Sequence, residues 1–358
     1  MGKSAVRNYG VDIARIIAIL FVVIIHNIGP GGVLGAQTET NVPWFLANVI
    51  ENLGIVAVNV FGMITGYLMV GRKFKAVRIL DIVFITIFWS IITTFIFETM
   101  GYDILSTKLF AIALPITHAQ YWYTNAYIAL AVIAPFINYG IEKVGELTFR
   151  RILIAIIILA GTAGVTDSLY LLGGYSGYWL IVLYLFGAYI KLHGDKIKIS
   201  QFSLFLIYLF AALVELLVQY LLAFKTSVVF MGYNISTSLV SSYVAIPVVV
   251  GSIALFLFMI RINVKNSAVI RVLSFFAPLS FGIYLIDTSM LNGTVLTNLF
   301  TQYAVSHGIR AVIFAVVLGV VFYVGFALME YARVLLFTLI RFDVFIKFLV
   351  SLFNKIVK

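Results

Sequence analysis

The chain lacks cysteine and has few charged residues. Of its 358 residues, 63% are hydrophobic and 11% are charged, whereas soluble domains carry about 25% charged residues. The absence of cysteine excludes disulfides, thiolate metal sites and thiol nucleophiles. No linker between soluble domains and no low-complexity segment interrupts the chain. The composition therefore excludes an ordinary soluble protein and indicates a polytopic membrane protein with one main domain.

Long apolar runs account for most of the chain. A run of about 18 or more apolar residues is long enough to cross a bilayer as a helix. The sequence therefore predicts an all-α integral membrane protein with about ten transmembrane helices, at residues 10–29, 46–70, 77–97, 121–141, 150–167, 177–192, 201–224, 237–260, 270–291 and 309–332.

Basic residues alternate between the predicted loops. Of 24 Lys and Arg residues, Arg15 lies within a span, three (Lys108, Lys225, Arg310) fall on one side, and the remaining twenty fall on the other. By the positive-inside rule, both termini lie in the cytoplasm, and we expect a plasma membrane, of a bacterium. The net charge of +10 thus reflects topology and attraction to anionic membrane lipids, and we expect no nucleic-acid partner.

The first predicted span carries three polar groups, Asp12, Arg15 and His26. Each charge inside a span costs about 2.5–3.5 kcal/mol on insertion scales, so such groups indicate a functional site. At about 100° per residue, Arg15 and His26 point within about 20° of each other, and Asp12 lies about 60° from Arg15. All three share one face, with His26 about 16 Å along the axis from Arg15. A signal peptide is the alternative, but an acid and an arginine beside the apolar run argue against it.

The second span has two features with two interpretations each. Gly62 and Gly66 lie one turn apart, which is typical of close helix packing or of a motif at a site. The basic run that follows is either an anchor on anionic headgroups or a set of cations for a phosphate-bearing ligand. This run comprises Arg72, Lys73, Lys75 and Arg78.

Two later segments place polar groups near the outer side. Residues 106–127 are too long and too apolar for a simple loop, and Pro115 breaks any helix there. This segment either dips into the protein, where His118, Trp122, Tyr123 and Asn125 supply donors to a cavity, or forms an interfacial aromatic girdle. In the ninth span, Asp287 lies at a depth similar to that of His26. Asp287 is therefore a candidate for the carboxylate that orients the imidazole.

Three further patterns predict structure more than chemistry. Glu215 and Gln219 are one turn apart, which favours interhelical hydrogen bonding. Glu330 and Arg333 are three residues apart and predict a local ion pair. We expect the membrane domain to cover residues 1–338. Residues 339–358 alternate basic and apolar side chains and predict an amphipathic helix on the inner leaflet.

Taken in order, these motifs resemble acyltransferase family 3, whose integral membrane proteins O-acylate cell-envelope and other glycans. The family's first-span signature, an arginine, ten residues and a histidine, is matched by Arg15 and His26. Asp12 stands at the place of the family's preceding aspartate. The family's F-x-x-S-G-Y motif resembles Phe61, Thr65, Gly66 and Tyr67, with threonine in place of serine and three residues rather than two after the phenylalanine.

The remaining motifs of the family follow along nearly the whole chain. Its R-x-x-R pattern is matched by residues 72–75 with lysine in the last place, and lysine lacks the planar fork that binds phosphate bidentately. The W-[FY] element corresponds to Trp122 and Tyr123. The S-x-G-I-Y-L-I-H pattern is present at 280–287, but its final histidine is Asp287 here. Glu330 resembles the glutamate that often closes the last span.

The resemblance implies an acyl-CoA co-substrate, most often acetyl-CoA, and a hydroxyl acceptor on a carbohydrate or lipid-linked sugar. No cofactor is expected to be bound permanently. Some relatives carry a fused extracellular domain, for which a chain ending just after its tenth span leaves no room. The basic residues Arg72, Lys73 and Lys75 would bind the CoA phosphates. Residues expected to contact substrate are Trp122, Tyr123, Tyr67 and Asp287.

Acyl transfer from a thioester to an alcohol needs a base for the hydroxyl and a partner for the developing oxyanion. His26 is the candidate base, because its unperturbed pKa lies near 6.5. Arg15, oriented by Asp12, would stabilise the negative charge. Direct attack by the hydroxyl is preferred, and a transient acyl-imidazole stays open. We expect no metal, because the four histidines, at 26, 118, 193 and 307, lack ligand spacing.

Two other classes of function compete with an acyltransferase. A transporter or flippase of an envelope precursor would also carry intramembrane Asp, Arg and His, but it predicts an internal repeat with matched broken helices. The second half of the sequence repeats nothing like the first-span motif. A catalytically silent scaffold would have little reason to bury the charges of the first span.

Overall fold

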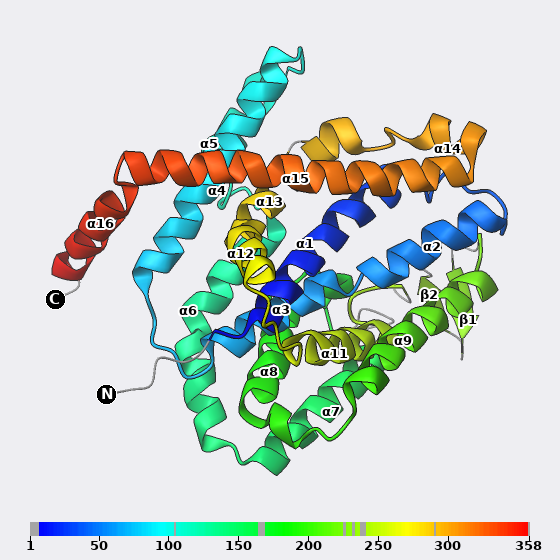
Figure 1. The fold of residues 1–358 in the computed structure, drawn as a ribbon, viewed down its shortest axis with the longest axis horizontal. Coiled ribbons are helices and arrows are strands. Elements are labelled where there is room, and N and C mark those ends of the chain that lie inside the picture. The colour runs from blue at the N-terminus through cyan, green and yellow to red at the C-terminus, as the bar shows by residue number, and fades with distance from the viewer. Residues whose placement is uncertain are drawn as a thin grey trace.

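The structure, a computed structural model, describes residues 7–103, 105–163, 169–224, 227–230, 233–236, 241–289 and 291–356. Helices make up nearly all of its regular elements (Figure 1), as the sequence predicts. A two-stranded antiparallel hairpin, β1 (Ser227–Phe230) with β2 (Tyr233–Ser236), is an exception. The helices are α1 (Tyr9–Ile28), α2 (Val42–Gly54), α3 (Ala57–Met69), α4 (Ala76–Thr99), α5 (Leu105–Ala113), α6 (Trp122–Lys143), α7 (Glu146–Ala163), α8 (Gly177–His193), α9 (Gln201–Leu221), α11 (Ile246–Ile260), α12 (Ser267–Phe276), α13 (Ser280–Asp287), α14 (Thr301–His307), α15 (Ile309–Leu339) and α16 (Phe342–Ile356).

Among the described residues, seven candidate membrane spans are long and apolar enough to cross a bilayer, so the chain is a multi-pass integral membrane protein. They are α1, α2 with α3, α4, α6, α9, α12 with α13, and α15. The three other predicted spans coincide with α7, α8 and α11, which have 18, 17 and 15 residues. Helix α7 also begins with charged residues. The predicted spans 150–167 and 237–260 extend over residues 164–167 and 237–240, which lie outside the described residues.

Helix α1 lies at the centre of the bundle and packs against α2, α3, α11, α12, α13 and α15 (Figure 1). Its first turn is capped by the Asn8 side chain, which accepts a hydrogen bond from the Gly10 amide. The buried side of the helix carries small and branched residues, with Ala14 and Ile19 fully inaccessible. Because neighbours enclose α1, its polar side chains face protein rather than lipid.

The glycines of the second predicted span serve helix packing. A Cβ at Gly66 would collide with the Tyr184 carbonyl on α8, and a Cβ at Gly187 would collide with the Met63 carbonyl on α3. At Gly62, it would lie 2.6 Å from the Leu183 side chain. The packing interpretation is therefore confirmed, and the close crossing of α3 and α8 holds α3 in place.

Buried polar side chains tie other helices together. Gln219 on α9 and Asn52 on α2 exchange two hydrogen bonds of 2.8 and 3.0 Å, so Gln219 confirms the predicted interhelical bonding. The predicted ion pair of Glu330 and Arg333 also forms. It is buried rather than interfacial, and Trp89 on α4 donates to Glu330 at 2.7 Å. This contact joins α4 to α15.

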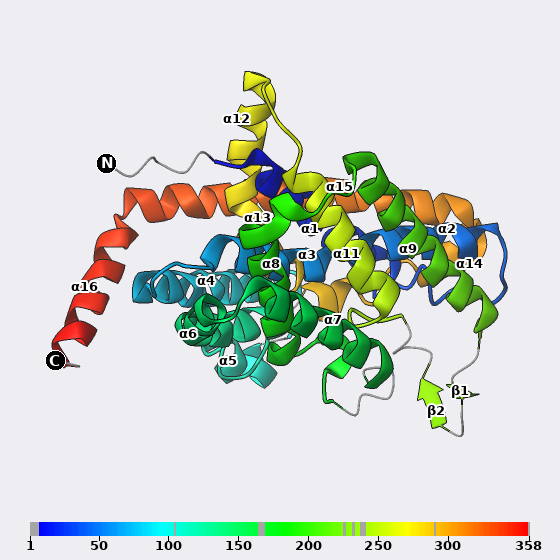
Figure 2. The same ribbon diagram turned by 90° about the horizontal axis from the view of Figure 1, so that it is seen from below.

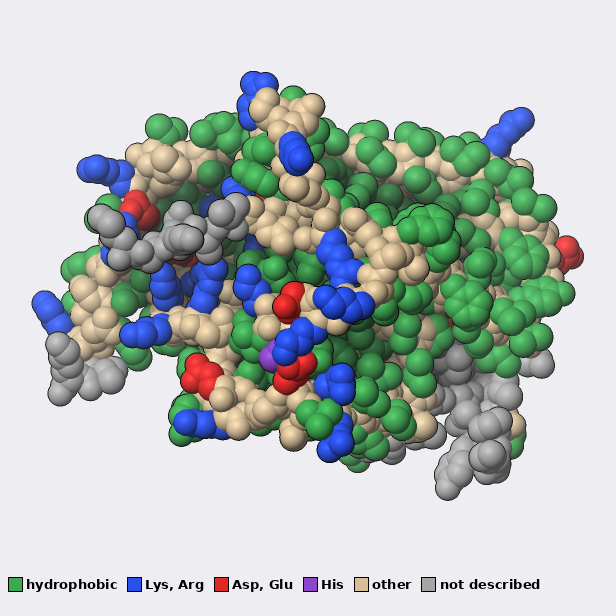
Figure 3. Space-filling view, turned by 60° about the horizontal axis from the view of Figure 1, so that its bottom comes forward, with side chains coloured by type: hydrophobic (Ala, Val, Ile, Leu, Met, Phe, Trp, Pro, Cys, Tyr) green, Lys and Arg blue, Asp and Glu red, His purple; other side chains and the backbone are tan. Residues whose placement is uncertain are grey.

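The ends of the helices segregate by charge. The N-terminal end and the turns between α6 and α7 and between α8 and α9 lie on one side of the bundle, opposite the α1–α2 loop and the α14–α15 turn (Figure 1). Most Lys and Arg side chains gather over the left and middle of the face in Figure 3, and hydrophobic side chains cover much of its right part. Helix α12 and the hairpin project on opposite sides in Figure 2. The separation of charged from hydrophobic side chains on the surface is typical of a protein that spans a membrane.

Helix α16 is set apart from α15 by a break at Arg341, which has a φ of 53°. Its Phe342 and Phe345 rings lie 5.5 and 5.7 Å from the Phe84 ring on α4. The break falls close to the predicted boundary between residues 338 and 339. Residues 357 and 358 of the predicted tail lie outside the described residues.

Candidate active site

A cavity of about 460 Å³ lies between α1, α3, α4, α6 and α13 and the loops before α8 and α11. Its two ends differ in chemistry. Arg15, Arg72 and Arg78 line one end, and His26 lines the other. His26 is eleven positions after Arg15 on α1, which corresponds to about 16 Å of helix. The rest of the lining is mainly apolar and includes Ile64, Leu68, Met69, Ile82, Pro278 and Phe281.

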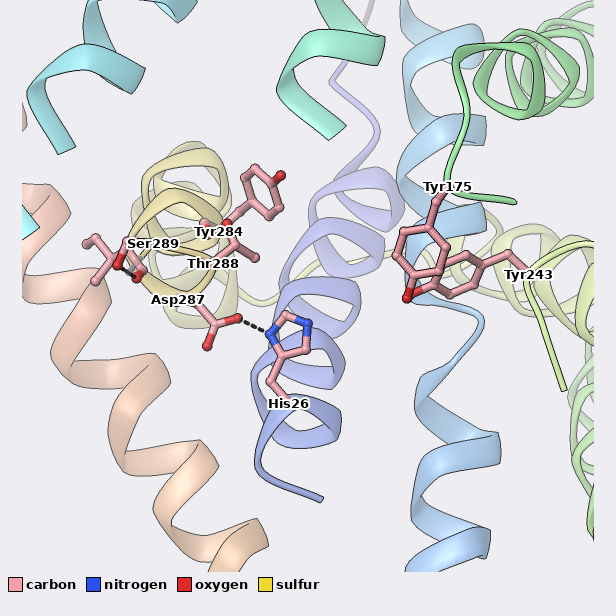
Figure 4. Close-up of polar contacts among 8 residues, drawn as sticks. His26, Tyr175, Tyr243, Tyr284, Asp287, Thr288 and Ser289 are labelled. Atoms are coloured by element: carbon pink, nitrogen blue, oxygen red, sulfur yellow. Dashed lines mark hydrogen bonds and ion pairs between the residues drawn. The ribbon is translucent and has the colours of Figure 1, made fainter. Parts of the chain in front are cut away.

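His26 and Asp287 form a buried pair at one end of this cavity (Figure 4). The Nδ1 atom of His26 lies 2.6 Å from Oδ2 of Asp287, although the two residues are 261 positions apart in sequence. Asp287 is fully inaccessible, whereas the His26 side chain is 21% exposed. Since an ionised carboxylate only accepts hydrogen bonds, Nδ1 carries the proton, which leaves Nε2 with a lone pair. The predicted orienting contact is therefore present.

Asp287 lies behind the imidazole and is not among the residues that line the described cavity. Of the two roles that the sequence suggests for Asp287, contact with substrate and orientation of the imidazole, this placement supports only the second. Its other carboxylate oxygen, Oδ1, has no hydrogen-bond partner among the described residues.

The arginine end of the cavity continues toward the basic run before α4. Arg72 and Arg78 line both the main cavity and a small adjoining hollow, which Lys73 and Lys75 also border. Tyr127 on α6 interacts with both Arg78 and Arg15. Arg72 of the predicted phosphate-binding set therefore faces the main cavity, whereas Lys73 and Lys75 lie at its edge.

Asp12 does not contact Arg15 through a hydrogen bond in the described part of the chain. Its carboxylate accepts a 2.7 Å hydrogen bond from Nε of Arg7, and this bond raises the pKa of Arg7. Asp12 lies in the first turn of α1, nearer than Arg15 to the N-terminal segment that holds Arg7. Its offset of about 60° from Arg15 around the helix turns its carboxylate toward Arg7. Asp12 interacts with Arg15 through its charge, and its role in orienting Arg15 stays a prediction. Arg15 and His26 do share one face and one cavity.

The predicted substrate-binding aromatics separate into two groups. Trp122 and Tyr123, at the start of α6, line the cavity. Tyr67 does not: its ring packs edge-on against Phe256 at 5.7 Å, and the ammonium of Lys191 lies 4.7 Å from its centre. Tyr67 therefore does not line this cavity, and its role as a substrate contact stays a prediction. It follows the packing glycine Gly66 and faces α8 and α11 instead.

Several residues in or beside the cavity are not singled out by the sequence analysis. Arg78 belongs to the basic run, but nothing in its spacing distinguishes it from its neighbours. Tyr175 and Tyr243 come from loops before α8 and α11, and their hydroxyl groups lie 3.2 Å apart. Glu51 on α2 interacts electrostatically with His26, and its Oε2 atom is buried without a hydrogen-bond partner in the described part of the chain. Only tertiary contacts reveal these residues.

Comparison with known families adds one finding. A family model described as an acyltransferase domain matches residues 8–330. No curated protein and no solved structure matches the chain. The matched range includes every residue that lines the cavity.

Proposed function

This chain belongs to acyltransferase family 3 and is a membrane acyltransferase, and we propose that it moves an acyl group, most simply acetyl, from acyl-CoA to a carbohydrate hydroxyl. The acceptor is a cell-envelope carbohydrate or a lipid-linked sugar. One observation carries the proposal: a histidine held by a buried carboxylate lies at one end of a cavity, and three arginines lie at the other.

The arginine end suits the donor. The phosphates of CoA are anionic, and guanidinium groups bind phosphate through paired, charge-assisted hydrogen bonds. Arg15, Arg72 and Arg78 would hold them, with Lys73 and Lys75 at the edge. The mainly apolar middle of the cavity accommodates the pantetheine arm, which carries the thioester toward His26. Arg15 lies about 16 Å along α1 from His26, so its guanidinium does not reach an oxyanion beside the imidazole. Arg15 thus takes a donor-binding role.

The histidine end suits the chemistry. The hydroxyl oxygen of the acceptor attacks the thioester carbonyl as Nε2 of His26 takes the hydroxyl proton. The buried carboxylate of Asp287 stabilises the imidazolium that forms and fixes its orientation. When the C–S bond breaks, the electron pair goes to sulfur and His26 returns the proton to give free CoA. A direct transfer needs no covalent intermediate, so it is the simpler of the two routes.

The acceptor would enter beside Trp122 and Tyr123. Both rings line the cavity, and the Trp122 ring lies 4.9 Å from that of Tyr175. Aromatic faces pack well against the apolar faces of sugar rings, and the indole N–H and phenol O–H provide polar tips. These features support a carbohydrate acceptor rather than a simple alkyl alcohol.

The same proposal includes a topology of ten spans with both termini in the cytoplasm of a bacterium. Each of the ten predicted spans overlaps a helix or a helix pair. The gathering of Lys and Arg on one part of the surface supports the assignment of that side as cytoplasmic (Figure 3). The membrane domain would end at residue 338, and the α16 segment would lie on the inner leaflet as a separate tail.

The test is thioester turnover by the purified protein with radiolabelled acetyl-CoA, in the presence and absence of octyl glucoside as a sugar probe. We expect release of free CoA thiol that falls about 10²–10⁴-fold in His26→Ala. A His118→Ala variant, altered at a histidine outside the cavity lining, is the matched control and should turn over as the wild type does. Turnover that survives in His26→Ala, or that is absent from the wild type, would refute the proposal.

A further inference from the structure

The transition state of acyl transfer places a negative charge on the carbonyl oxygen close to His26, and this oxyanion needs a hydrogen-bond donor. Arg15 is about 16 Å away along α1. Thr288 and Tyr284 also line the cavity, but neither hydroxyl group suits this role. Thr288 Oγ1 donates to the Tyr284 carbonyl at 2.7 Å. The Tyr284 hydroxyl points away from the imidazole (Figure 4).

Tyr175 and Tyr243 line the cavity as well. They lie across from His26, on the side to which the ring nitrogen not bonded to Asp287 points, and their hydroxyl groups converge (Figure 4). The two hydroxyl oxygens are 3.2 Å apart, and the ring centres are 4.9 Å apart. Two hydroxyls in contact share one proton between them, so the second proton is available to a third group.

Tyr243 is held in place from several sides. Its amide donates to the Gly173 carbonyl at 3.1 Å, and its carbonyl accepts a 2.9 Å hydrogen bond from the Asn59 side chain. The Asn59 oxygen in turn accepts from the indole of Trp179 at 2.9 Å. Asn59 and Trp179 are both buried. This network fixes the Tyr243 backbone before substrate binds, as an electrostatic site requires.

The loop before α8 is shaped to contact Tyr243. Gly174 has a φ of 100°, and a Cβ at this position would lie 2.5 Å from the Tyr243 Cβ. Only glycine permits both this conformation and this approach. The Tyr175 ring follows directly and lies between Tyr243 and Trp122. The two loops therefore form one unit that carries both hydroxyl groups.

We propose that the Tyr243 hydroxyl donates a hydrogen bond to the oxyanion of the tetrahedral intermediate and that the Tyr175 hydroxyl donates to Tyr243. This inference rests on the proposed function. As the acceptor oxygen bonds to the carbonyl carbon, the carbonyl π pair moves to oxygen, and Nε2 of His26 takes the hydroxyl proton. Tyr243 shares its proton with the oxyanion without transferring it. Collapse restores the carbonyl and expels the thiolate, which His26 protonates.

Tyr243→Phe tests the assignment because it removes the hydroxyl and keeps the ring. We expect kcat for thiol release from acetyl-CoA to fall about 10²–10³-fold, the usual effect of losing one oxyanion donor. The KM for acetyl-CoA should change little, because the bond strengthens only in the transition state. Tyr175→Phe leaves Tyr243 in place and should lower kcat about 2–10-fold, the effect of one neutral hydrogen bond.

Tyr323→Phe is the matched control. Tyr323 on α15 is buried, and its hydroxyl has no hydrogen-bond partner among the described residues. Its removal should leave kcat and KM unchanged. Thermal unfolding of each variant in detergent checks that the fold is kept. If Tyr243→Phe misfolds, Tyr175→Phe decides, and a kcat equal to that of the wild type overturns the proposal.

The outcomes separate the two proposals. If Tyr243→Phe retains kcat within about threefold of the wild type while His26→Ala is inactive, the oxyanion assignment fails and the proposed function stands. A rise in KM with unchanged kcat would also overturn it, because Tyr243 would then bind the ground state as well as the transition state. If the wild type shows no turnover that depends on His26, both proposals fail together.

Discussion

Two pairs of ionisable side chains are buried between the helices, and they differ in what they leave unpaired. His26 with Asp287 and Glu330 with Arg333 each join at 2.6 Å. Both carboxylates are buried, with Glu330 2% exposed. In each pair an acid meets a cationic or protonatable partner within the membrane domain. The two pairs are therefore alike in distance and in the burial of the carboxylate.

Their surroundings differ. Both oxygens of Glu330 are bonded, because Arg333 donates to each and Trp89 donates to one. A Cβ at Gly282 would overlap the Glu330 carboxylate, so packing encloses the group. His26 instead presents Nε2 to a cavity. The comparison teaches that unused hydrogen-bonding capacity beside open space separates a reactive pair from a structural one.

The largest effect should come from Asp287→Asn. An amide in place of the carboxylate loses the charge that stabilises the imidazolium and no longer selects the tautomer that leaves Nε2 free. We expect kcat for acetyl-CoA turnover to fall about 10²–10⁴-fold, with little change in the thermal unfolding of the protein. Steady-state kinetics at several pH values give this result. Wild-type turnover in this variant would show that the contact is only structural.

Changes in the structural pair, Glu330 with Arg333, should lower the stability of the protein. Glu330→Gln removes the charge that balances buried Arg333, and breaking a buried pair costs about 3–5 kcal/mol of the free energy of unfolding. Denaturant unfolding in detergent measures the loss. The control is Asp343→Asn on α16, where an exposed partner, Lys347, lowers the pKa of the carboxylate through a hydrogen bond. That change should be barely measurable. Equal stability of both variants would mean that the enclosed pair is not structural.

The smallest effect concerns the arginine end of the same cavity. Arg72→Gln removes a charge-assisted hydrogen bond to phosphate and should raise the KM for acetyl-CoA about 10–100-fold with little change in kcat. Lys75→Gln, at the edge of the cavity, should raise KM less. Calorimetry with CoA supplies the matching affinities. A larger effect at Lys75 than at Arg72 would mean that the phosphates bind outside the cavity and that the donor extends less far into it.

Local sequence patterns account for much of the agreement between the structure and what the sequence predicts. The apolar runs locate the helices because lipid and protein interior both demand apolar surface and internally bonded backbone. The spacing of Arg15 and His26 places both on one cavity because the helical repeat is fixed. The same geometry does not predict Asp12, whose partner Arg7 lies in the N-terminal segment. Tyr67 illustrates a second limit of sequence patterns, since a residue of a family motif can serve helix packing rather than line the cavity.

What the sequence alone determines is therefore the membrane class, the helical segments and the polar face of α1, since each depends on residues close together in the chain. The tertiary structure decides which distant groups meet. It joins Asp287 to His26 across 261 positions, brings Tyr175 beside Tyr243, and turns Tyr67 away from the cavity. The reason is that side-chain contacts between helices depend on crossing angles and close packing, which small residues such as Gly66 and Gly187 set at positions far from the site.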